Sequence, residues 1–280
     1  MNNIKFYFKI GDDIEKEIHD VFPKVSYLGH VGRPEFSNIY NTPTIVDGEQ
    51  FIQTVIAPTT ITCRFIMTFS DWYDYQLNKN QFYGLFGNKD LIRIRTDSFP
   101  AKVFFGRPQS FDILPSSDGS HDCVIEIPFD NPSGYKQSIM RSDALYEYSE
   151  NAWQLGMNLP NGQDLKYTFN NVPSIRVYNA SDVDIDPYFS KHDLRLLLNF
   201  TGPNIRLVNQ TNGTEWAYNE AQTMADSIIL DGIDTTLNGQ SANLNTDFGY
   251  MKLDKGWNTI VVTGATQYQL TFSFPFLYLG

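Results

Sequence analysis

Residues 62–69 read TCRFIMTF, and residues 70–87 continue as SDWYDYQLNKNQFYGLFG. In the first segment every second side chain is apolar, which is the period of a strand with one buried face. In the second segment aromatic side chains recur at helical spacing, Asp71 offers an N-cap, and Gly87 supplies a stop. The sequence therefore predicts a strand that runs directly into a helix over residues 71–86, the one clear helix of the chain.

The remainder of the first half is predicted to consist of strands and turns. Residues 4–10 alternate as an opening strand, and residues 91–96 (LIRIRT) place two isoleucines opposite two arginines. Residues 101–105 and residues 110–114 are each long enough for a strand, and we expect them to pair across the Gly-Arg-Pro turn between them.

Between the first strands and the central helix, residues 33–57 have the character of an extended arm. The segment holds Pro34 and Pro43 together with the turn signal Asp47-Gly48. Prolines and an Asp-Gly turn punctuate a chain and argue against a compact core element. We therefore predict an extended arm or a long hairpin.

The second half is predicted to be β-structure throughout. Asn212-Gly213 is the strongest hairpin signal in the chain and lies in the middle of residues 204–218. Residues 268–278 alternate strictly, so we expect their large apolar side chains to face inward and Ser273 to face outward. Short strands separated by turns at roughly regular spacing indicate an antiparallel sandwich.

The composition changes near the middle of the chain. Residues 130–134 (DNPSG) interrupt the strand pattern, and a polar, aromatic stretch without a clear period follows them. We predict a mainly β protein with an N-terminal domain at residues 1–140, a linker at 141–160 and a C-terminal β-sandwich domain at 161–280. The N-terminal domain is expected to be a β-sandwich with one α-helix and an extended hairpin arm.

Composition and charge exclude several classes of protein. The net charge of −11 and the isoelectric point near 4.7 argue against a groove that grips nucleic acid. No apolar run approaches the length of a membrane helix, and two lysines interrupt the only candidate secretory signal, so we expect no membrane insertion. Cys63 and Cys123 lie within strand-like runs, and we expect buried thiols rather than a disulfide.

The sequence carries no pattern typical of catalysis or of metal binding. The four histidines lie outside the known zinc motifs: they are His19, His30, His121 and His192. Three alternating acids resemble the start of an EF-hand loop: they are Asp182, Asp184 and Asp186. Because Pro187 stands where that loop needs a glycine, we expect three carboxylates that face water. We therefore nominate no catalytic, cofactor-binding or metal-binding residue, and no cofactor.

Three tryptophans leave a binding function open. Trp153, Trp216 and Trp257 would suit a platform on which sugars stack, but packing in the core is the commoner role of a residue such as Trp216, which alternates with Tyr218. The aromatic content of 15% and the absence of a catalytic pattern fit a protein that works through its surfaces, because aromatic residues are enriched at interfaces.

An ordered set of features resembles a known family. Asp47-Gly48 precedes an extended segment, a strand with Arg64 runs into the helix, and Leu85-Phe86-Gly87 leads to Leu91-Ile92-Arg93-Ile94. Residues 99–103 (FPAKV) resemble a Pro-Gly-Lys turn with Ala101 in place of glycine, and residues 123–129 lead to Asn131-Pro132 and Ser138. In this order the features resemble the distal tail protein (Dit) family of siphophages. Residues 205–212, 253–264 and 272–279 resemble the C-terminal, galectin-like sandwich of that family more loosely.

The resemblance implies a non-enzymatic hub of the phage tail tip or baseplate. In this family the N-terminal domains close into a homohexameric ring, which joins the major tail tube protein to the tail-associated tip protein. The C-terminal domains project outward and carry receptor-binding or other baseplate proteins for host adhesion. The expected location is the virion tail tip, assembled in the cytoplasm of the bacterial host.

Two other functions stay open at this point. A carbohydrate-binding module would contact host cell-wall polysaccharide through the C-terminal sandwich, and exposed Trp or Tyr beside polar groups would favour it. A hydrolase with a scattered pair of acids is the third reading, but no pair among the 32 acidic residues stands out.

Overall fold

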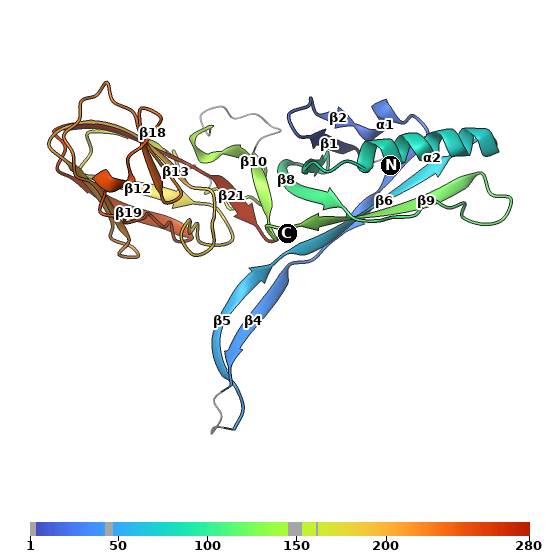
Figure 1. Cartoon of the computed structure of the whole chain (residues 1–280), viewed down its shortest axis with the longest axis horizontal. Coiled ribbons are helices and arrows are strands. Elements are labelled where there is room, and N and C mark those ends of the chain that lie inside the picture. The colour runs from blue at the N-terminus through green and yellow to red at the C-terminus, as the bar shows by residue number, and fades with distance from the viewer. Residues whose placement is uncertain (1–3, 43–46, 145–152, 161) are drawn as a thin grey trace. The chain divides into compact units, whose positions relative to one another are not determined.

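The computed structural model describes residues 4–42, 47–144, 153–160 and 162–280. The chain forms two compact units, shown with their elements in Figure 1. The first unit comprises Met1–Lys136 together with Leu279–Gly280, and the second comprises Gln137–Tyr278. The mainly β fold predicted from the sequence is confirmed. Within the described residues, no helix combines the length and the apolar character that a membrane span requires.

The first unit is built on one antiparallel sheet with the strand order β2-β1-β7-β8-β9-β6-β3. Strand β8 pairs with β7 along its first part and with β9 at its end, so the sheet folds into two halves. Phe6 of β1 lies 5.0 Å from both Tyr27 of β3 and Phe65 of β6, measured between ring centroids, so the halves face each other across the core. The strands are β1 (Phe6–Ile10), β2 (Lys16–Glu17), β3 (Val25–Val31), β6 (Thr59–Thr68), β7 (Ile92–Thr96), β8 (Phe99–Pro108) and β9 (Asp122–Asn131).

The predicted strand–helix segment is confirmed. Strand β6 buries alternate side chains, and α2 (Trp72–Phe86) follows it after a short turn. The carboxylate of Asp71 caps α2 by accepting a hydrogen bond from the backbone N–H of Asp74 at 2.9 Å, and Gly87 ends the helix. A second helix, α1 (Ile18–Val21), has only four residues.

Helix α2 closes the core between the two halves of the sheet through its aromatic face. Phe82 lies 5.4 Å from Phe22 and 5.8 Å from Phe65, and Phe86 lies 5.9 Å from Phe8. These aromatic side chains are buried. Burial of large aromatic rings dominates core energetics, so this contact fixes the helix on the sheet.

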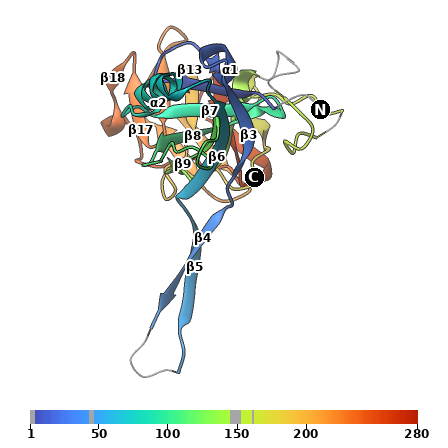
Figure 2. The same cartoon turned by 90° about the vertical axis from the view of Figure 1, so that its right-hand side faces the viewer.

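The predicted arm is also confirmed as a hairpin. Strand β4 (Glu35–Asn41) pairs with β5 (Gln50–Ala57), and within the described residues neither strand pairs with any other. Figures 1 and 2 show this hairpin extending away from the body of the first unit. Its tip, residues 43–46 with Pro43, lies outside the described residues.

The expected pairing of residues 101–105 with residues 110–114 is wrong. Strand β8 continues through Gly106 to Pro108, because the glycine at position 106 lets the backbone pass close to Phe129. A Cβ added at Gly106 would lie only 2.8 Å from the Cβ of Phe129. The segment that follows forms no strand and instead covers α2, where the carbonyl of Ile113 accepts a 2.6 Å hydrogen bond from the Tyr75 hydroxyl.

The second unit is a sandwich of two antiparallel sheets. One sheet has the order β11-β20-β13-β16-β17-β18 and the other has the order β12-β19-β14-β15. The strands are β11 (Thr168–Asn170), β12 (Ser174–Asn179), β13 (Arg195–Thr201), β14 (Ile205–Asn209), β15 (Glu215–Tyr218), β16 (Ile228–Asp231), β17 (Asp234–Leu237), β18 (Gln240–Ser241), β19 (Gly256–Thr263) and β20 (Gln267–Ser273). Strands β10 (Lys136–Arg141) and β21 (Pro275–Tyr278) form a further pair, and η1 (Ser142–Ala144) and η2 (Asn243–Asn245) are short 3-10 helices. The predicted Asn-Gly hairpin is β14–β15, with Gly213 at φ +77°.

The strict alternation predicted for residues 268–278 holds only in β20. From Phe272 to Tyr278 every side chain is buried, so Ser273 does not face water as expected. The Ser273 hydroxyl accepts a hydrogen bond from Arg141 at 2.7 Å and donates one to Asp143 at 2.8 Å. Burial of this hydroxyl costs little because both of its hydrogen-bonding roles are satisfied.

Part of the predicted linker, residues 145–152, lies outside the described residues. On either side of that gap, Ser142, Trp153 and Met157 are buried. Cys63 and Cys123 are free and buried, as predicted.

Candidate assembly surfaces

The histidines and aspartates considered above for catalysis or metal binding do not come together in one site within the described residues. Among the described residues, no group of three or more His, Cys, Asp or Glu side chains is arranged to hold a metal ion. The imidazole of His192 lies 3.2 Å from the backbone nitrogen of Asp186 and packs within its own loop. His121 contacts the Phe69 carbonyl at 3.3 Å. These contacts hold loops in place.

The expectation that three aspartates face water is wrong for one of them. Asp186 is buried, and its carboxylate accepts hydrogen bonds from the backbone N–H groups of Tyr188 and Phe189, each at 2.9 Å. A carboxylate satisfied by two backbone donors stabilises a local turn. Asp184 forms an ion pair with Lys252 at 2.8 Å. Burial raises the pKa of the Asp184 carboxyl, but the contacts with Lys252 and with the Lys255 backbone outweigh it, so the pKa is lowered.

The three tryptophans do not form an exposed platform. Trp153 and Trp216 are buried, which confirms core packing as the role of Trp216. Trp257 is partly exposed, but the Arg176 guanidinium lies over its ring at 4.3 Å and the Tyr178 ring lies 5.0 Å away. One face of this indole is thus already occupied.

The hairpin arm exposes the most conspicuous apolar surface of the first unit. Phe36 is 56% exposed and Phe51 is 55% exposed. Phe36 is opposite Ile56, and Tyr40 is opposite Phe51, so aromatic and aliphatic side chains share one face of the hairpin. The Tyr40 and Phe51 rings contact each other with centroids 5.9 Å apart, but a two-stranded hairpin has no core of its own, so these side chains remain largely exposed.

Helix α2 supplies a second exposed surface at its N-terminal end. Trp72 is 60% exposed and Tyr73 is 87% exposed, and Leu77 is exposed one turn further along. Beside Trp72 an open groove of about 550 Å³ is lined by residues that include Phe69 and His121. The first unit therefore presents two different surfaces, one on the arm and one on the helix.

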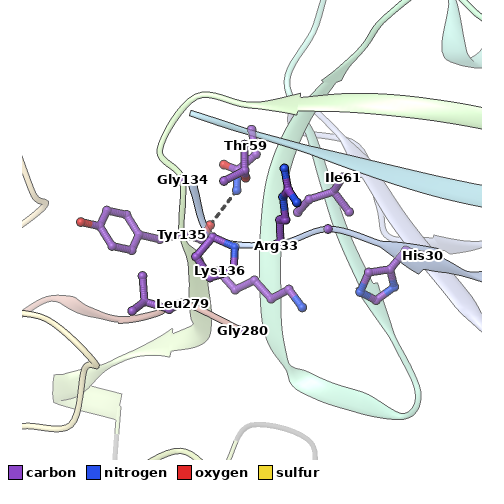
Figure 3. Close-up of a pocket in the computed structure, with 12 residues that line it drawn as sticks. His30, Arg33, Thr59, Ile61, Gly134, Tyr135, Lys136, Leu279 and Gly280 are labelled. Carbon is purple, nitrogen blue, oxygen red and sulfur yellow. Dashed lines mark hydrogen bonds between the residues drawn. The ribbon is translucent and has the colours of Figure 1, made fainter. Parts of the chain in front are cut away.

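A small pocket lies at the base of the arm, within the first unit (Figure 3). Its volume is about 60 Å³, and its charged or titratable lining residues are His30, Arg33 and Lys136. The Asn131 amide donates a 3.0 Å hydrogen bond to the Tyr135 carbonyl and fixes the turn that carries Lys136. Figure 3 shows the Lys136 side chain extending toward the His30 ring.

Electrostatics in this pocket disfavour added positive charge. Burial, with a smaller contribution from the nearby Lys136, lowers the pKa of His30, and the ring contacts the Tyr27 hydroxyl at 2.7 Å. Burial also lowers the pKa of Lys136. The pocket therefore holds an ammonium group in a partly desolvated position, where an anion would be favoured.

A loop of the second unit exposes an aromatic cluster. Tyr188 stacks on Tyr250 with ring centroids 4.9 Å apart and planes inclined by 20°. Phe189 is 76% exposed, and Lys191 lies over the Tyr188 ring at 5.7 Å. No periodic pattern in the sequence indicates this cluster, because Tyr188 and Tyr250 are far apart in the chain.

Two of the comparisons with known proteins find matches. Residues 13–128 match the family model of the phage tail protein RIFT-related domain. None of the curated proteins compared with the sequence matches it. Among solved structures, the Dit protein of phage SPP1, described as a paradigm of the hub adsorption apparatus in phages that infect Gram-positive bacteria, superposes with a TM-score of 0.68 at 10% identity. The match covers 97% of this chain and 99% of that chain.

Two structures of the phage p2 baseplate in its activated conformation are more distant. The one with strontium has a TM-score of 0.44 at 12% identity, and the one with calcium has 0.43 at 11% identity. Each match covers 98% of both chains. The resemblance to the distal tail protein family predicted from the sequence is confirmed, and the chain shares the fold of SPP1 Dit.

Proposed function

We propose that this protein is the structural hub of a siphophage tail tip, assembled as a homohexameric ring through its hairpin arm. The observation that carries the proposal is the arm itself, a two-stranded hairpin that exposes Phe36, Tyr40 and Phe51 and pairs with no other described strand. Exposed apolar surface of this kind marks a site of protein association. The fold shared with SPP1 Dit supports the same role.

A ring requires two different surfaces on each subunit. A head-to-tail contact closes into a ring only if one surface of a subunit meets a different surface of the next. The arm supplies one such surface, and the body of the first unit supplies the other. We propose that residues 1–140 form the ring and that residues 161–280, joined by a linker at 141–160, form a galectin-like domain that faces outward.

The partners follow from this arrangement. One face of the ring would bind the major tail tube protein, and the other would bind the tail-associated tip protein. The C-terminal domains would carry receptor-binding and other baseplate proteins for host adhesion at the virion tail tip, after assembly in the host cytoplasm. The role is mechanical and needs no catalysis.

Removal of the arm tests the ring. Deletion of residues 41–54 should give a folded monomer, because the deletion removes most of the exposed hairpin and leaves the core of the first unit intact. A milder variant, Phe36→Ser with Phe51→Ser, should weaken assembly in the same direction. Leu244→Ser is the matched control, because Leu244 is exposed but lies in the second unit. Rings that survive the deletion would show that the arm is not the contact.

Glycan binding by the second unit is the other candidate function, and the aromatic cluster favours it. Stacked Tyr188 and Tyr250 with exposed Phe189 offer ring faces on which sugars stack. Tyr188→Ala with Phe189→Ala should abolish retention on purified host cell wall if this candidate is correct. Leu155→Ala, at another exposed position of the same unit, is the control.

A further inference from the structure

We propose that the pocket at the base of the arm receives a carboxylate from the acidic arm end of a neighbouring copy, and that Lys136 binds this carboxylate. The acidic arm end is defined as Asp47 and Glu49. The inference rests on the proposed ring and adds to it by naming the groups that meet. It is supported by the basic lining of the pocket, by the pocket's volume, by the absence of an ion pair at Lys136 and by the acidic end of the arm.

The side chains that line the pocket include bases but no acid, and the one carboxylate in the lining is that of Gly280, whose oxygen accepts a 2.9 Å hydrogen bond from Lys102. Besides His30 and Lys136, the pocket is lined by Arg33, and neither an Asp nor a Glu lines it. A neighbouring cavity of about 180 Å³ shares His30 and Lys136, also without an acidic lining residue. In a chain with 32 acidic and 21 basic residues, two adjoining cavities that are lined by several bases and by no Asp or Glu side chain are suited to an anion.

The size of the pocket selects the kind of anion. A volume of about 60 Å³ corresponds to roughly two water molecules in the liquid. That space accommodates the carboxylate end of a side chain and is too small for a sugar ring. The pocket therefore suits a single carboxylate better than a larger anion.

Lys136 is the base that lacks a counter-charge. Arg33 is already paired with Glu35 at 2.9 Å. Across the described ranges, Lys136 forms no ion pair, and burial lowers its pKa against an opposing contribution from Cys63. A partly desolvated ammonium without a partner is costly, and a carboxylate placed beside it removes that cost.

The arm of a second copy is the natural source of the acid. No Lys or Arg occurs from residue 34 to residue 63, whereas the described end of the arm carries Asp47 and Glu49. A subunit's own arm end cannot fill its own pocket, because the eight residues of β5 span about 26 Å and lead away from it. A neighbouring copy in a head-to-tail ring can bring its arm end to this position.

Charge reversal tests the contact. Lys136→Glu, and separately Asp47→Lys with Glu49→Lys, should each raise the dissociation constant of the assembly at least about tenfold, because like charges then meet. The three substitutions together should restore most of the assembly. Lys16→Glu, which changes the same charge at an exposed position outside the pocket, should have no effect. Thermal unfolding of each variant checks that it is folded.

A cross-link gives an independent readout. Isotopically labelled and unlabelled protein are mixed, and a carbodiimide joins lysine amines to carboxylates that touch them. The inference predicts a mixed-label cross-link between the peptide with Lys136 and the peptide with Asp47 and Glu49. If rings form but this cross-link is absent and the charge reversals have no effect, the inference is wrong while the proposed ring stands. If the wild-type protein neither assembles nor cross-links, both are wrong.

Discussion

Phe65 is the side chain on which the core of the first unit converges. It is fully buried and lies between 5.0 and 6.2 Å from the rings of Phe6, Tyr27, Phe82 and Phe86. Phe65→Ala should lower the free energy of unfolding by about 3–5 kcal/mol, because it removes a large apolar group and leaves a cavity. Urea denaturation measures the loss. An unchanged midpoint would contradict the assignment of this core.

A single carboxylate sets the start of the central helix. Asp71→Ala removes the hydrogen bond from the Asp74 backbone N–H and should cost about 1 kcal/mol of stability. Asp118→Ala removes the same charge from an exposed loop position and should leave stability unchanged. Equal unfolding midpoints for the two variants would show that the cap contributes nothing.

The carboxylate of Asp74 should make the stability of the first unit depend on pH in the acidic range. Its carboxylate accepts hydrogen bonds from the Lys24 ammonium at 2.6 Å and from the Ser70 backbone N–H at 2.7 Å, and these lower its pKa from 3.8 to about 2. A carboxylate whose pKa is lower in the folded state stabilises that state above its unfolded pKa. This stabilisation should therefore be lost as the pH falls from about 4 to about 2.

The test is a comparison of variants across that window. Asp74→Asn removes the titrating group, so its unfolding midpoint should depend less on pH between 4 and 2 than that of the wild type. The other carboxylates titrate in both proteins and cancel in the difference. Parallel midpoints for the two proteins would contradict the ion pair with Lys24.

At the scale of the element, two glycines should respond to alanine in opposite directions. Gly84 lies on the exposed side of α2 with open space around it, so Gly84→Ala should stabilise the protein by about 0.5–1 kcal/mol. Gly106→Ala should destabilise it by about 1–3 kcal/mol, since the new Cβ meets Phe129 where β8 passes from one half of the sheet to the other. Thermal unfolding measures both. Effects of the same sign would contradict this description of β8.

Elements with a strong local signal could be predicted, and those shaped by distant contacts could not. The period of β6, the cap at Asp71 and the Asn212-Gly213 turn are properties of neighbouring residues, and the structure contains all three. The end of β8 depends on Phe129, and the burial of Ser273 depends on Arg141, which is 132 residues away. No local period reports such contacts.

The same distinction holds for the whole molecule. The arm could be predicted because its prolines and Asp47-Gly48 are local signals. The pocket could not, because it brings together His30, Lys136 and Gly280 from three separate parts of the first unit. Nor does any pattern at residues 279–280 indicate that they belong to the first unit.

The proposed function of the whole molecule depends on closure of a ring. The most direct test is the molar mass of the purified protein, measured by light scattering on a size-exclusion column over a range of concentrations. The ring account predicts a species of six 32.1 kDa chains, or a pair of such rings. A mass of 32.1 kDa at every concentration would contradict it.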